Sequence, residues 1–146
     1  MAESDDSPSK AILEHVLVPI AHEEDARRTA RALEPYQPTQ VTAVHVIEKG
    51  EGVPDKTSVK YSKEVAAEAY EAVHAVFPGA ETHTAYARNV VDEIFSVADE
   101  VGASAIAFHP QGGNRLLQFL SGDRSLKLVT QADRPVIALP HPERNS

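Results

Sequence analysis

Hydrophobic residues fall into two kinds of segment that alternate from residue 15 to residue 139. One kind is a short run of consecutive apolar residues, such as VTAVHVI, which is typical of a strand buried on both faces of a parallel sheet. The other is a longer stretch with apolar residues every three or four positions, the pattern of a helix with one buried face. The expected strands are 15–20, 41–47, 81–87, 104–108 and 135–139, and the expected helices are 22–34, 57–76, 89–102 and 122–131.

Local signals define several of these elements. Asn89 is a helix-capping residue, and Gly102 is suited to end the same helix. The threonine-rich alternation of 81–87 indicates a partly exposed strand at a sheet edge. In the last helix we expect Leu126 and Val129 to be buried. The buried face expected for the long second helix is Tyr61, Val65, Ala69, Val73 and Val76.

The alternation of strand and helix predicts a doubly wound α/β fold, because each parallel pair of strands needs a crossover helix. In such a sheet, ligands bind beyond the carboxyl ends of the strands. Two loops follow a strand directly, at 19–25 and at 109–123, and the second is rich in glycine and leads into a helix. Its backbone N–H groups are therefore a candidate anion site, although such glycines often serve only to turn the chain.

Length, charge and cysteine content argue against several classes of function. The 146 residues suffice for one domain, which we place at 13–140, between a disordered acidic tail at 1–12 and a short tail at 141–146. The polar, acidic start is not a signal peptide, and no apolar run is long enough to cross a membrane. A net charge of -8 argues against nucleic acid as a partner. The absence of cysteine excludes disulfides, thiolate metal sites and cysteine nucleophiles, and fits the cytoplasm.

Candidate catalytic and metal chemistry is sparse. His109 with Asp123, or His22 with Glu23 or Glu24, are the acid–base pairs that the spacing permits, but a histidine at a strand end is more often a packed or surface residue. We therefore predict no catalytic residues. The seven histidines show no paired metal-ligand spacing, and His45, within an apolar strand, is expected to be a hydrogen-bonded core residue.

Several of these segments together resemble the universal stress protein family. They are HVLVPI before the first helix, VTAVHVI, DEIFSVADEVGASAIAF and the ending QADRPVIALP, and the likeness runs from about residue 15 to residue 140. The resemblance implies a five-stranded parallel sheet in the order 3-2-1-4-5. It also implies a homodimer formed by pairing of the last strand, with Val136, Ile137, Ala138 and Leu139 at the interface.

Many members of that family bind ATP through a loop that reads Gly, two residues, Gly, nine residues, Gly, then Ser or Thr. Gly112 and Gly122 keep the spacing of the last two glycines, but His109 replaces the first and Asp123 replaces the hydroxyl residue. The aspartate that ATP-binding members carry after the first strand is Ala21 here. The positions that the resemblance assigns to nucleotide binding are Pro19, Ala21, Val46, Phe108, His109, Gly112, Gly113, Asn114, Gly122, Asp123 and Ser125.

These departures weaken a nucleotide site. A side chain at His109 blocks close approach of the backbone, and a carboxylate at Asp123 repels phosphate. Donors at Gly113, Asn114 and Ser125, or a protonated His109, are the available compensation. We therefore expect a cytoplasmic regulatory or protective module of stress response that is not an enzyme. We expect it to act as a homodimer, with an unidentified protein partner and without tight ATP binding or any other cofactor. The main alternative is a nucleotide- or anion-binding sensor that uses the modified loop, and a hydrolase acting on nucleotides ranks last.

Overall fold

Five parallel strands form a single sheet in the order β3-β2-β1-β4-β5, which confirms the predicted doubly wound α/β fold and its strand order. The computed structural model describes residues 11–48, 56–109 and 122–140. The edge position expected for the third strand is also confirmed. The strands are β1 His15–Pro19, β2 Gln40–Glu48, β3 Glu81–Ala87, β4 Ala105–Phe108 and β5 Val136–Ala138.

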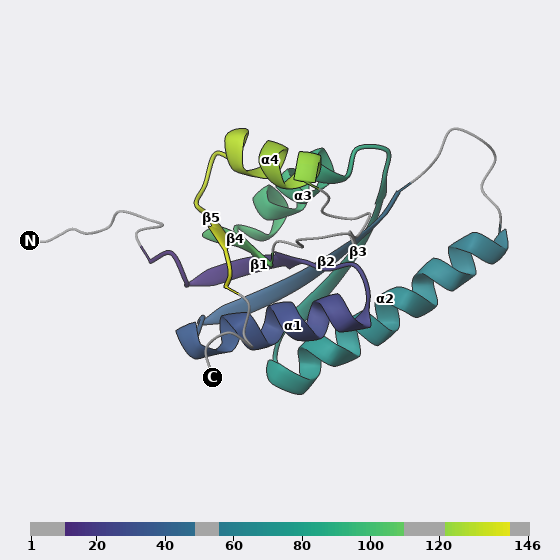
Figure 1. Cartoon of the computed structure of the whole chain (residues 1–146), viewed down its shortest axis with the longest axis horizontal. Helices are drawn as coiled ribbons and strands as arrows, with labels where there is room; N and C mark the ends of the chain where they lie inside the picture. Colours follow the sequence, from purple (N-terminus) through teal and green to yellow (C-terminus); the bar gives the residue numbers. More distant parts are fainter. Residues whose placement is uncertain (1–10, 49–55, 110–121, 141–146) are drawn as a thin grey trace, which may run out of the picture.

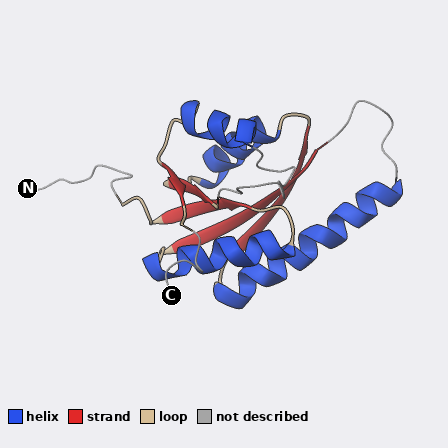
Figure 2. Cartoon of the chain, viewed as in Figure 1, coloured by secondary structure: helices blue, strands red, loops and turns tan. Residues whose placement is uncertain are grey.

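Helices cover both faces of this sheet (Figures 1 and 2). Two of them lie side by side on one face, and two on the other, so the protein has three layers. The helices are α1 Glu23–Leu33, α2 Lys56–Val76, α3 Val90–Val101 and α4 Gly122–Thr130. α1 and α2 form the lower layer of Figure 1, and α3 and α4 form the upper one. None of the helices in the described ranges is both long and apolar enough to span a membrane.

The ends of α3 are set by its sequence, as predicted. The side chain of Asn89 accepts a hydrogen bond of 3.0 Å from the N–H of Asp92 and so caps the helix. Gly102 ends it with φ 71°, a left-handed conformation that costs glycine little.

Two apolar cores fill the space between the layers. Alternate residues of a strand point to opposite faces, so Val16 and Val18 join the core beneath α1 and α2, while Leu17 joins the core beneath α3 and α4. Both cores consist mainly of valine, alanine, leucine and isoleucine from central strands and inner helix faces.

Three predicted core residues are instead exposed. In α4, Leu128 is fully buried, whereas Leu126 and Val129 are 63% and 53% exposed. A helix turns by about 100° per residue, so once Leu128 faces the sheet the other two must point elsewhere. Tyr61, in the second turn of α2, is 67% exposed.

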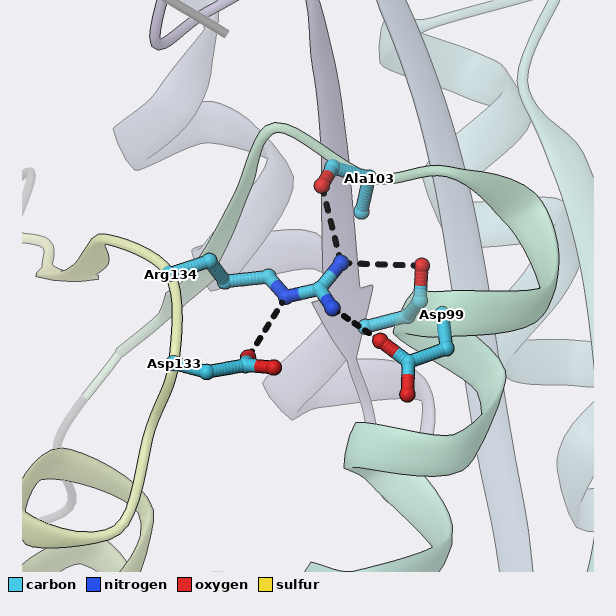
Figure 3. Close-up of polar contacts among 5 residues, drawn as sticks. Asp99, Ala103, Asp133 and Arg134 are labelled. Carbon is cyan, nitrogen blue, oxygen red and sulfur yellow. Dashed lines mark hydrogen bonds and ion pairs between the residues drawn. The ribbon is translucent and has the colours of Figure 1, made fainter.

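Arg134 connects the end of α3 to the segment that enters β5 (Figure 3). Its Nη1 donates to the carbonyl oxygens of Ala98 (3.0 Å) and Ala103 (2.9 Å). Its Nη2 pairs with the carboxylate of Asp99, and its Nε donates to Asp133 at 3.2 Å. Arg134 thus adds a side-chain donor to two carbonyl groups at and just after the end of α3, of which that of Ala98 also accepts from the backbone N–H of Ala103 at 2.9 Å.

Candidate functional site

The strand order reverses between β1 and β4, because from this pair the chain extends outward on one side to β2 and β3 and on the other to β5. Ligands of doubly wound sheets bind beyond the carboxyl ends of the strands at such a point. Here those ends lead into Ala21 and His22 after β1 and into His109 after β4. His109 is only 4% exposed.

Asp25, at the start of α1, is a buried carboxylate beside this point. The backbone N–H of Ala21 donates to Asp25 Oδ2 at 2.8 Å, which holds the turn between β1 and α1. Burial raises the pKa of Asp25 from 3.8 to about 6, although this hydrogen bond and the charges of His22 and Arg28 act in the opposite direction.

His45 reaches the same turn from β2. Its Nδ1 lies 3.2 Å from the carbonyl oxygen of Ile20 and donates to it, because a carbonyl oxygen can only accept. Burial lowers the pKa of His45, the bond to Ile20 raises it, and the nearby His22 lowers it further. The prediction that His45 is a hydrogen-bonded core histidine is confirmed.

His22 acts on both Asp25 and His45, so the three groups lie within electrostatic reach of one another. The arrangement places a buried acid and a buried neutral base on the two sides of one backbone turn. Both side chains bind the backbone of this turn, Asp25 by accepting from Ala21 and His45 by donating to Ile20. The other acids near His22 are engaged elsewhere, because Glu23 pairs with Arg27 and Glu24 with Arg28.

The structure brings three of the predicted ligand residues onto one apolar cluster. Val46 and Phe108 belong to the core beneath α3 and α4, and Ala21 packs against it. Pro19 is buried at the end of β1. The predicted site thus has an apolar wall from β2 and β4 and a polar rim from the β1–α1 turn.

The remaining predicted positions belong to the glycine-rich loop. Gly112, Gly113 and Asn114 lie outside the described residues. The other three, Gly122, Asp123 and Ser125, open α4, as expected for a loop that leads into a helix start, but their side chains also lie outside the description.

A separate groove of about 560 Å³ lies between α1 and α2. Its charged side chains carry mixed signs, with Arg27 already paired to Glu23 at 2.8 Å, so it does not attract an anion. The groove is lined by Glu23, Arg27, Arg31, Glu68, Glu71, Ala72, Ala75 and Val76. Among the residues that the structure describes, no cluster of three or more histidine or carboxylate side chains is arranged to hold a metal ion.

Comparison with known proteins gives the family. A model of the universal stress protein family matches residues 13–140. The chain belongs to the universal stress protein family. No curated protein matches it. Members of this family are associated with stress responses, so a stress-response protein is the coarse function that the match supports.

Solved structures of universal stress proteins share the fold. One from Archaeoglobus fulgidus has 23% identity and a TM-score of 0.66, with coverage of 86% of this chain and 97% of that chain. Another from the same organism, in complex with dAMP, has 24% identity and a TM-score of 0.63, with coverage of 86% and 96%. A third, in complex with cAMP, has 13% identity and a TM-score of 0.62, with coverage of 88% and 97%.

Sequence reasoning did not identify Asp25 as a residue of this site. Three consecutive acids begin α1, where negative charge interacts favourably with the helix dipole. They are Glu23, Glu24 and Asp25, and nothing in their order indicates which one is buried. A period of 3.6 residues offers a weak signal, because Asp25 shares the inner helix face with Thr29 and Ala32.

Proposed function

We propose that this universal stress protein acts in the cytoplasm as a homodimeric regulatory or protective module, associates with a protein partner, is not an enzyme and does not bind ATP tightly. The observation that carries the proposal is the free edge of β5. Within the described residues β5 pairs only with β4, and an unpaired strand edge favours association.

The two edges of the sheet differ in how they are protected. Most residues of β3 are exposed or half-buried and only Ala85 is buried, and the hydroxyl of Tyr70 donates to the carbonyl oxygen of His83 at 2.8 Å. β5 is a three-residue strand whose Val136 and Ile137 are only half-buried. Its edge is apolar and uncharged, which suits a second copy of the same surface.

Hydrogen bonding to β4 defines which backbone groups of β5 are available. The N–H of Ile106 donates to Pro135, and the N–H of Leu139 donates to Phe108, so residues 135, 137 and 139 face β4. Val136 and Ala138 therefore direct their N–H and C=O groups outward. A twofold axis at Ile137 would pair each Val136 with the partner copy's Ala138 in an antiparallel ladder of four hydrogen bonds.

The residues of the β1–α1 turn support the proposal that ATP does not bind tightly. Ala21 offers no side-chain acceptor, and its backbone N–H is already engaged by Asp25. The Asp25 carboxyl, with a pKa of about 6, is mostly ionised at neutral pH. A negative charge at this largely buried turn is unfavourable for a phosphate brought near it.

Titration of the full chain with ATP, AMP, dAMP and cAMP, with and without magnesium, tests the ligand part of the proposal. We expect no saturation in the micromolar range. The second candidate function, a nucleotide or anion sensor, is favoured by the dAMP and cAMP complexes of the two solved relatives, and micromolar saturation would establish it. Replacing His109→Gly and Asp123→Ser together should raise ATP affinity if those residues block the loop.

A further inference from the structure

The exposed side of α4 carries two large apolar residues that the fold leaves uncovered. Leu126 and Val129 are 63% and 53% exposed, and they stand one helical turn apart on adjoining faces. Leu128 anchors the opposite side of α4 in the core.

The orientation of α4 follows from its polar contacts. Lys127 points toward α3, because its Nζ lies 3.9 Å from the carboxylate of Asp92 and 3.5 Å from Asn89. Val129 lies two residues further along, about 200° around the helix from Lys127. Val129 is therefore on the flank that faces away from α3. α3 contacts β2 and β3, and α4 is the crossover helix between β4 and β5, so this flank faces the free edge of the sheet.

The β5 edge alone is too small to hold a dimer. It offers outward backbone groups from only two residues, bounded by Pro135 and Pro140, which have no N–H to donate. Four backbone hydrogen bonds contribute roughly 2–6 kcal/mol in total, before the entropy of association is subtracted. Stable interfaces bury about 1,200–2,000 Å² of surface, so a β5 dimer needs further apolar area beside the strand.

We propose that Leu126 and Val129 provide that area by packing against the same residues of a second copy, in an α4–α4 contact beside the paired β5 strands. This inference rests on the proposed homodimer. An antiparallel pair has its twofold axis perpendicular to the sheet, which keeps both α4 helices on the same face. Strands are spaced by about 4.8 Å, so a helix centred over β4 and β5 would approach its twin to about 10 Å, close to the distance of packed helices.

Cross-linking is the direct test, because the chain has no cysteine. The variant Val129→Cys, treated with a short bis-maleimide in dilute solution, should form a covalent dimer. Tyr61→Cys, at a position that is also exposed but lies in the opposite helix layer, is the matched control and should remain monomeric on a denaturing gel. Absence of a cross-link at Val129 in a protein that is dimeric in solution would overturn the α4 contact.

Sedimentation equilibrium distinguishes a failure of the α4–α4 contact from a failure of the proposed homodimer. The double variant Leu126→Gln, Val129→Gln should raise the dimer dissociation constant by roughly tenfold or more, because it removes four apolar side chains, two from each copy, from the interface. Tyr61→Gln should leave it unchanged. A wild-type monomer at tens of micromolar would overturn the homodimer itself. A wild-type dimer that Ala138→Pro dissociates, but that the double variant leaves intact, would reject only the α4 contact.

Discussion

The two ends of the sheet both bury polar groups, but only the carboxyl end places a buried carboxylate among them. At the amino end, the ring Nε2 of His15 lies 2.7 Å from the hydroxyl of Thr42, and the backbone N–H of His15 donates to Ser104 at 2.9 Å. Ser104 in turn donates to the carbonyl of Ile12 at 2.7 Å. At the carboxyl end, the central group is Asp25, a buried carboxylate whose burial raises its pKa.

This difference places groups that stabilise the fold at the amino end of the strands and a candidate functional group at their carboxyl end. Polar groups with well-matched partners add stability, whereas a buried carboxylate that ionises near neutral pH reduces it. Groups with perturbed pKa values are frequent at functional sites. Substitutions at the amino end should therefore weaken the fold, and those at the carboxyl end should leave it intact or strengthen it.

Arg134→Met should produce the largest loss of stability at the amino end. The carbonyls of Ala98 and Ala103 would lose a shared donor, and Asp99 would lose its ion pair. The Arg134 side chain is only 15% exposed, so we expect the free energy of unfolding to fall by about 3 kcal/mol. Urea denaturation followed by circular dichroism measures this change in the free energy of unfolding.

Arg27→Met is the control for that substitution, because Arg27 forms an exposed ion pair with Glu23 within α1. Its loss should change stability by less than about 0.5 kcal/mol. If the two substitutions change the free energy of unfolding equally, the contacts of Arg134 with the end of α3 do not contribute specifically to stability.

Asp25→Asn should act in the opposite direction at neutral pH. A rise in pKa from 3.8 to about 6 corresponds to about 3 kcal/mol, at about 1.4 kcal/mol for each pKa unit. The folded state keeps this proton to higher pH than the unfolded chain, so wild-type stability falls as pH rises from about 4 through 6. The amide cannot ionise, and the variant should be about 2 kcal/mol more stable than wild type at pH 7.5.

The pH dependence distinguishes ionisation from a packing effect. Below pH 4 the gain of Asp25→Asn should disappear, because both residues are then neutral. Glu24→Gln, which removes an exposed partner of Arg28, should show no such dependence. A gain that is the same at pH 4 and pH 7.5 would contradict the raised pKa of Asp25.

The fold was predictable from sequence to a greater extent than the site. Buried parallel strands are marked by apolar runs such as VTAVHVI, and α3 by a capping asparagine and a terminal glycine, so their positions follow from local signals. The strand order came from the family resemblance. α4 has several apolar residues around its circumference, and only the packed structure shows that Leu128 rather than Leu126 faces the core.

The site was less predictable because its groups come from separate strands. The motif positions identified Ala21, Val46 and Phe108, which adjoin one apolar cluster in the structure. The raised pKa of Asp25 depends on how deeply α1 buries its first turn, and that is a tertiary property. Local sequence offers only the weak signal that Asp25 shares the inner helix face with Thr29 and Ala32.

Ser104→Ala gives the smallest expected effect and is the most specific test of the amino end. Removing the hydroxyl leaves the backbone N–H of His15 without its 2.9 Å acceptor in a buried position. The expected loss is about 1–2 kcal/mol, the usual penalty for an unsatisfied buried donor. Ser96→Ala, on the exposed face of α3, should instead stabilise slightly because alanine favours helices. If Ser104→Ala unfolds at the same urea concentration as wild type, the amino end does not depend on this hydrogen bond, and the contrast between the two ends reduces to the charge of Asp25.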